Sequence, residues 1–109
     1  MLAEIQVLPN PPGTADNYYE HVEAAIAVVE SSGLTFEVDA LGTTLEGDAD
    51  AVWATIRAAH EAVLTAGAGT VVTVVKLAQS GAGREDSTIG SLTGKFRESS
   101  TGKFRESAS

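Results

Sequence analysis

The polar residues best suited to chemistry gather in one short stretch, Gly42 to Asp50, with the sequence Gly-Thr-Thr-Leu-Glu-Gly-Asp-Ala-Asp. Thr43, Thr44 and Glu46 bring hydroxyl groups and a carboxylate to a point where a strand pattern gives way to a helix start. These groups can accept hydrogen bonds from an amino group and fix the orientation of a ring. We therefore predict a ligand-binding site here. The alternative is structural, because the same side chains can cap the next helix or pair across a hairpin.

Two aromatic residues stand near this stretch in the predicted order of elements. Tyr18 follows a proline-rich loop, and Trp53 lies in the first turn of the helix expected after Asp50. A cation over such a ring gains about 0.5 to 2 kcal/mol. We predict that both rings line the ligand pocket, with core packing as the alternative for each.

The sequence offers no recognisable set of catalytic or metal-binding residues. The chain holds two histidines, His21 and His60, and no cysteine, and neither histidine has a second one at metal-ligand spacing. Both histidines are therefore expected on helix surfaces. No nucleophile motif is present, and Ser80–Arg84 lacks the lysine and the following helix of a phosphate-binding loop. We predict a protein that is not an enzyme and requires no cofactor or metal.

Charge narrows the classes of ligand and partner. The 109 residues carry a formal net charge of −8, and residues 1–78 hold eleven acids against Arg57 and Lys76. An acidic body repels phosphate backbones and anionic lipid, and it favours small cations. We predict no nucleic-acid or membrane partner, although acidity also serves solubility alone. The start of the chain has no basic segment before an apolar run, so we expect neither a signal peptide nor a membrane span, and a cytoplasmic location.

Hydrophobic periodicity divides residues 1–78 into strands and helices. Alternation predicts strands and steps of three and four residues predict helices, and Pro, Gly and Ser clusters separate them. Thr14 or Asp16 is the expected cap of the first helix, and Asp48 or Asp50 that of the second. The last strand is apolar on both faces, which predicts cover on both sides or contact with another subunit. In order, the expected elements are a strand over 3–7, a helix ending at 31–33, strands over 34–38 and 43–46, a helix ending at 67–69 and a strand over 70–77.

This β-α-β-β-α-β order indicates an α+β protein with the ferredoxin-like fold. Short connections and right-handed crossovers give a four-stranded antiparallel sheet with two helices on one face. A core of this size is marginal when alone, and the open sheet face needs cover. We therefore expect a homo-oligomer.

The C-terminal extension, residues 79–109, differs in composition from the domain of residues 1–78. It is rich in Gly and Ser, and Thr93–Ser99 recurs as Thr101–Ser107, each reading Thr-Gly-Lys-Phe-Arg-Glu-Ser. Composition favours a flexible segment. Phe96 and Phe104 between basic residues offer an alternative, in which the extension docks on a neighbouring subunit. The second copy has the look of a duplication or a cloning product.

The chain resembles the small thiamine-binding family of ferredoxin-like proteins. The resemblance rests on Leu41–Gly47, Val52-Trp53, Ala58–Gly67 and Thr73–Lys76, together with Pro12-Gly-Thr14. It implies a homotetramer built by sheet association, which binds thiamine or its hydroxymethylpyrimidine part without turnover. Thr43, Thr44 and Glu46 match the segment that the family resemblance relates to the pyrimidine.

The chain departs from the family pattern after its last expected strand. Members often continue there with an acidic and arginine-rich run, whereas here Ala78-Gln-Ser-Gly-Ala-Gly83 intervenes before Arg84. Contacts of that run to ligand or subunit are therefore left open. The competing hypothesis is an oligomeric interaction or regulatory module that binds no thiamine-related ligand.

Overall fold

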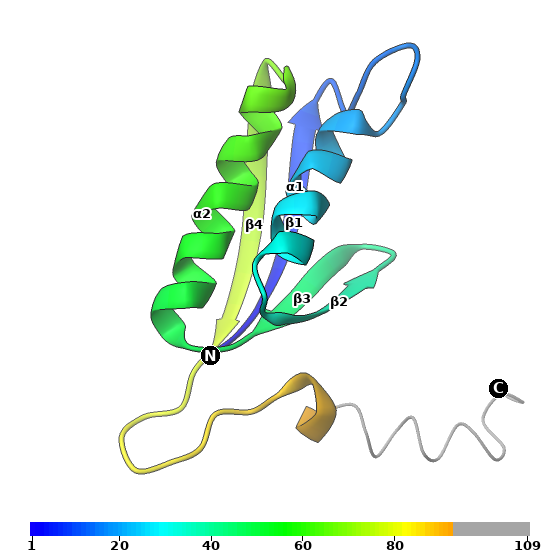
Figure 1. The fold of residues 1–109 in the computed structure, drawn as a ribbon. Helices are drawn as coiled ribbons and strands as arrows, with labels where there is room; N and C mark the ends of the chain where they lie inside the picture. Colours follow the sequence, from blue (N-terminus) through cyan, green and yellow to red (C-terminus); the bar gives the residue numbers. More distant parts are fainter. Residues whose placement is uncertain (93–109) are drawn as a thin grey trace, which may run out of the picture.

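The protein, described here by a computed structural model covering residues 1–92, is an α+β sandwich with two helices on one face of a four-stranded sheet (Figure 1). The ferredoxin-like prediction is confirmed. The repeated segments Thr93–Ser99 and Thr101–Ser107 lie outside the described residues. In chain order the elements are β1 (Leu2–Asn10), α1 (Glu20–Ser31), β2 (Thr35–Asp39), β3 (Gly42–Glu46), α2 (Ala49–Ala66) and β4 (Thr70–Ala78).

The strands follow the order β2-β3-β1-β4, and every neighbouring pair is antiparallel. The pairing of Glu4 with both Thr44 and Lys76 sets the register, and it places these three residues on the same face of the sheet. This face lies away from the helices and is called the open face below. The other face packs on α1 and α2.

The first strand is longer than its alternation predicts, because it continues through Pro9 to Asn10. The expectation that the prolines end the strand at residue 7 is wrong. The reason is the limited length of β3, whose pairing with β1 stops at Ile5. Beyond that residue β1 pairs only with β4, where Pro9 stands opposite Val71. A proline is tolerated where one side of the strand has no partner.

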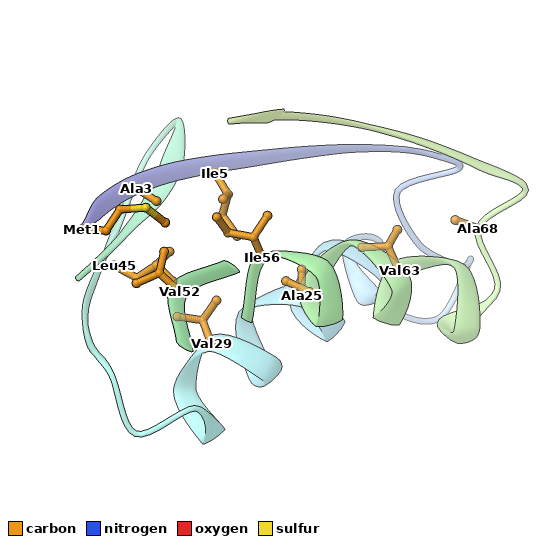
Figure 2. Packing of buried hydrophobic residues seen from close by; sticks show 11 residues of the cluster. Met1, Ala3, Ile5, Ala25, Val29, Leu45, Val52, Ile56, Val63 and Ala68 are labelled. Atoms are coloured by element: carbon orange, nitrogen blue, oxygen red, sulfur yellow. The ribbon is translucent and has the colours of Figure 1, made fainter. Parts of the chain in front are cut away.

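The core lies between the helices and the sheet. Val29 from α1, Leu45 from β3, and Val52 and Val63 from α2 are completely buried. Figure 2 shows Leu45, Val29 and Val52 close together, with Ile5 and Ile56 beside them. Burying such a side chain stabilises the fold by about 1.5 to 3 kcal/mol relative to leaving it exposed. This cluster fixes which face of each element points inward.

The helix ends agree with the sequence at α2 and disagree at α1. Asp48 caps α2, since its carboxylate accepts a hydrogen bond of 3.2 Å from the backbone N–H of Asp50. The expected cap of α1 at Thr14 or Asp16 is wrong, because the helix begins only at Glu20. Thr14 instead accepts a hydrogen bond of 3.1 Å from the backbone N–H of Asn17, so its hydroxyl stabilises a turn within the preceding loop.

The two histidines are not simple surface residues. His21 is buried with 2% of its surface exposed, and its Nδ1 donates to the carbonyl oxygen of Pro11 at 2.7 Å. The surface expectation for His21 is therefore wrong, since the loop after β1 and the end of α2 both close over it. Gly67, at φ +124°, ends α2 there, and a Cβ at that position would lie 3.3 Å from Nε2 of His21. His60 is half-buried, and its Nδ1 lies 2.6 Å from Oγ1 of Thr73 on β4.

The segment that follows β4 returns to the end of the sheet where the chain starts (Figure 1). Residues 79–92, called the strap below, end in a short helical segment that begins at Ile89. The amino group of Met1 donates to Gly47 O at 2.8 Å and to Asp86 Oδ2 at 2.5 Å. Asp86 also accepts from the backbone N–H of Ser80 at 2.6 Å. These contacts join the strap to its own chain, and docking of the extension on a neighbouring subunit stays a prediction.

Within residues 1–92, neither helix combines the length and the apolar character that a membrane crossing requires.

Candidate functional site

The polar stretch that the sequence singles out is divided between the two faces of the sheet. Side chains along a strand alternate in direction, so neighbouring residues of β3 point opposite ways. Thr43 points toward the helices and is 6% exposed, whereas Thr44 and Glu46 point to the open face and are half-buried. The structure thus brings Thr44 and Glu46 to one side and Thr43 to the other.

Thr43 lines a hollow between α1 and the β2–β3 hairpin, called the Thr43 hollow below. Its walls are mainly apolar, with Gln6 and Asp39 as further polar residues. They include Ile5 of β1, Ala25 and Val29 of α1, and Val38 and Leu41 of the hairpin. The side chains at its inner end are buried, while Leu41 at the hairpin turn is 79% exposed. The hollow is therefore an apolar recess that opens beside the hairpin turn.

The hydroxyl of Thr43 has no hydrogen-bond partner among the residues that the structure describes, although only 6% of the residue is exposed to solvent. Leaving a buried polar group unpaired costs about 1 to 3 kcal/mol. Such a group in an apolar recess is a ready partner for one polar atom of a ligand. It is the feature of this surface that packing does not explain.

The size of the Thr43 hollow limits what can enter. Its volume is about 180 Å³. For scale, an engineered apolar cavity of about 150 Å³ takes one benzene ring, and drug-sized ligands occupy about 300 to 1,000 Å³. The hollow therefore accommodates a single six-membered ring with small substituents. Any larger ligand must leave its remainder outside.

A second hollow of about 330 Å³ lies on the open face beneath the strap. Thr44 is at its centre with Glu4 and Glu37 from the flanking strands, and Ile89 and Leu92 of the strap line it from outside. Lys76 also lines it, with Nζ 3.7 Å from Oε1 of Glu4. This open-face hollow is acidic and half-covered, but every polar side chain in it is only half-buried or exposed.

Glu46 has a structural partner in the strap. Its Oε1 accepts a hydrogen bond of 2.6 Å from the backbone N–H of Ile89, at the start of the short helical segment. A carboxylate at this position satisfies a donor that the helical segment leaves open. Asp86 makes the other contact of the strap. Its pKa is held below its usual value by the hydrogen bond from the Met1 amino group and by that from the backbone N–H of Ser80. Glu46 therefore anchors the strap, and its predicted role as a ligand contact is untested.

The predicted aromatic residues lie apart from both hollows. Tyr18 is 70% exposed and stacks edge-on with Tyr19, their centroids 5.2 Å apart. Its loop, in blue, is at the opposite end of the molecule from the strap (Figure 1). Trp53 is 52% exposed and belongs to α2, which does not line the Thr43 hollow. The structure does not bring Tyr18 or Trp53 together with Thr43, and their binding roles stay predictions.

Residues that sequence reasoning passed over complete the two hollows. Ala25 faces the Thr43 hollow from α1, and Asp39 at the end of β2 lines both hollows. The ferredoxin-like order with strict alternation already implies that Glu4 and Glu37 share the face of Thr44. The same alternation places Thr43 and Thr44 on opposite faces of the sheet, so their separation could have been predicted from the strand pattern.

Among residues 1–92, no group of three or more His, Cys, Asp or Glu side chains is arranged to hold a metal ion.

Comparison with known proteins assigns the chain to a family. A family model for thiamine-binding proteins matches residues 3–98. The chain belongs to this family. In this thiamine-binding family member the match includes both helices, the strap and the sheet apart from Leu2. It therefore includes every residue that lines the Thr43 hollow.

The chain is also similar to individual proteins and to solved structures. A UPF0045 protein of Clostridium perfringens is 34% identical over 73 residues, which cover 67% of this chain and 75% of the relative. A UPF0045 protein of Methanothermobacter thermautotrophicus is 36% identical over 77 residues, covering 69% of this chain and 76% of the relative. Among solved structures, a domain of unknown function, DUF77, from Bacillus cereus has a TM-score of 0.78 at 32% identity and covers 90% of each chain. These likenesses support the same fold.

Proposed function

We propose that this protein binds thiamine, or its hydroxymethylpyrimidine part, without turning it over, and that the pyrimidine ring occupies the Thr43 hollow. The observation that carries the proposal is the buried Thr43 hydroxyl, which lacks a partner within residues 1–92 and faces an apolar recess. Membership in the thiamine-binding family supports the class of ligand.

The chemistry of an aminopyrimidine suits this recess. The ring is flat and apolar on its faces, which matches walls made by Ile5, Ala25 and Val29. Its edge carries an amino group that donates and ring nitrogens that accept, and a threonine hydroxyl does both. A volume of about 180 Å³ holds the pyrimidine but not the whole of thiamine. The thiazolium ring then lies outside the hollow, near the exposed end of the hairpin.

The groups that line the recess support binding without turnover. Its lining is mainly hydrocarbon, and Gln6 and Asp39 are its polar residues besides Thr43. Gln6 is uncharged, and Asp39 is exposed at the end of β2. General acid–base catalysis needs positioned donors and acceptors of matched pKa, and nucleophilic catalysis needs a nucleophile with an adjacent base. A lone hydroxyl with no base beside it recognises a ring but does not activate it.

Exchange of Thr43 for valine is expected to weaken binding of both thiamine and hydroxymethylpyrimidine by roughly tenfold, the worth of one buried hydrogen bond of about 1.4 kcal/mol. Without ligand, Thr43→Val should be as stable as the natural chain or more stable, because an unpaired buried hydroxyl is removed. Isothermal titration calorimetry and thermal unfolding measure the two effects.

Thr44→Val is the matched control, since Thr44 is the neighbouring residue on the opposite face. It should leave affinity for both ligands within about twofold. A larger loss in Thr44→Val than in Thr43→Val would move the site to the open face. Absence of heat for both ligands, at protein concentrations well above micromolar, would refute thiamine-related binding and favour the interaction-module hypothesis.

For the assembly, we propose a homotetramer formed through the open face. Val72 and Val74 of β4 are 61% and 45% exposed there, and Leu8, paired with Val72, is 47% exposed. One of the two expectations for β4 was that both faces of the strand are covered within the chain. This expectation is wrong for the single chain, because the open face of β4 is exposed. Contact with another subunit remains the proposal, because such a patch is typical of an interface.

Val72→Asp is expected to break this assembly, since a carboxylate would be buried between apolar side chains. Native mass spectrometry of the full chain should show a mass below that of the natural protein at the same concentration. Thr65→Asp, on an exposed position of α2, is the control and should not change the mass. An unchanged mass for Val72→Asp would place the interface elsewhere.

A further inference from the structure

The outer end of β2 carries the charge that a ligand in the Thr43 hollow would meet as it emerges. Asp39, the last residue of β2, is exposed and lines both the Thr43 hollow and the open-face hollow. It is the single charged residue among those that line the Thr43 hollow within the described chain. Asp39 pairs with Gly42 and belongs to the face of Glu37 and Thr44, so its carboxylate stands on the open-face side of the hairpin end that lines both hollows.

Among the described residues that line the Thr43 hollow, no basic side chain balances the charge of Asp39. Among the described residues that line the two hollows, Lys76 is the one basic residue. Lys76 lies on the open face with its Nζ 3.7 Å from Glu4, on the far side of β1 from β2. The electrostatic field at the part of a ligand that leaves the Thr43 hollow is thus set mainly by the Asp39 carboxylate.

The volume of the Thr43 hollow decides which part of the ligand meets that field. The hollow takes one ring, so the thiazolium of thiamine and anything attached to it remain outside. Thiazolium is a cation and is attracted by a carboxylate. A phosphoryl or diphosphoryl group attached through the hydroxyethyl arm is an anion and is repelled. The two ends of the ligand are therefore selected differently. The pyrimidine ring is selected by shape and one hydrogen bond, and the hydroxyethyl arm by its charge.

We propose that Asp39 makes this a charge-selective site, which accepts unphosphorylated thiamine and rejects its phosphate esters. The inference rests on the proposed function, because it requires the pyrimidine to occupy the Thr43 hollow. Hydroxymethylpyrimidine itself, which is uncharged and lies wholly inside, escapes the selection. Asp39 is accordingly a specificity residue that contributes little to binding of the ring alone.

Three ligands separate the contributions when each is titrated into the full chain by calorimetry at low ionic strength. Hydroxymethylpyrimidine reports the ring, thiamine adds the cation, and thiamine diphosphate adds the anion. We expect thiamine diphosphate to bind roughly tenfold or more weakly than thiamine. The difference should shrink as salt is raised, since exposed charges are screened over about 10 Å at 0.1 M.

Asp39→Asn should reduce that preference to about threefold or less, and any change in its affinity for hydroxymethylpyrimidine should be smaller than the change in this preference. Asp16→Asn is the control, because it removes the same charge from an exposed loop position that lines neither hollow. It should keep the full preference for thiamine over the diphosphate.

The outcomes distinguish this inference from the proposed function. If hydroxymethylpyrimidine binds and thiamine diphosphate binds as tightly as thiamine, charge selection is refuted and ring binding stands. If Asp39→Asn and Asp16→Asn lose the preference for thiamine over the diphosphate equally, the role of Asp39 is refuted. The net charge of the protein would then account for the preference. If none of the three ligands binds, the proposed function fails, and the inference fails with it.

Discussion

Replacement of Ala25 by leucine is expected to abolish ligand binding while the protein stays folded. Ala25 is 3% exposed and lines the Thr43 hollow from α1. A leucine there projects into the space that the pyrimidine would occupy, so the ring is excluded by steric overlap. We expect affinity for thiamine and hydroxymethylpyrimidine to fall by about a hundredfold or more, because both the hydrogen bond and the apolar contact are lost.

The stability of Ala25→Leu separates a filled hollow from a damaged core. Overpacking a dense core costs about 1 to 3 kcal/mol, whereas filling a void avoids that cost. Because a hollow of about 180 Å³ adjoins Ala25, the free energy of unfolding should be unchanged or higher. Ala27→Leu, at an exposed position of the same helix, serves as the control and should bind normally. Normal binding by Ala25→Leu would show that the ligand lies elsewhere.

Replacement of Leu45 by alanine is expected to lower the free energy of unfolding by about 2 to 5 kcal/mol. Leu45 is completely buried, stands between Ala3 and Phe36 in the sheet and packs toward both helices (Figure 2). Its loss removes apolar burial and leaves a void that the rigid sheet cannot close. A domain of ordinary stability has about 5 to 15 kcal/mol in total, so Leu45→Ala takes a large share.

Urea unfolding followed by circular dichroism measures the loss, with the slope of the transition as a check on two-state behaviour. Leu41→Ala is the matched control, because Leu41 is 79% exposed at the hairpin turn. Its stability should change by less than about 0.5 kcal/mol. Similar losses in the two variants would contradict the packing of the hairpin described above. Since Leu41 also lines the Thr43 hollow, only its stability, and not its affinity, serves as the control.

Much of the fold could be predicted from local patterns. Alternation in β2 and β3 and the Asp48 cap of α2 are properties of short segments, and the structure agrees with them. Errors arose where another contact, from a distant strand or within the same loop, replaced the one that the local rule assumes. Pro9 stays in a strand because β3 is too short to reach it, and α1 starts late because the Thr14 hydroxyl stabilises a turn instead.

The candidate site was predicted less completely than the fold. Sequence reasoning selected Thr43, Thr44 and Glu46 as one group on the basis of their closeness in the chain. Adjacent residues of a strand point to opposite faces, so closeness in sequence does not give closeness in space. Glu46 meets Ile89, which is 43 positions away, and this contact could not be found from spacing.

The sequence by itself determined the α+β class, the order of the elements, the acidic charge and the resemblance to thiamine-binding proteins, because periodicity, composition and short motifs are local. Tertiary structure alone decided that the polar stretch from Gly42 to Asp50 serves two faces. It left the Thr43 hydroxyl buried in an apolar recess, joined Glu46 to the strap, and set Asp39 at the hairpin end that lines both hollows. These features depend on how β3 is enclosed by β1, β2 and α1, and such enclosure is a property of the packed chain.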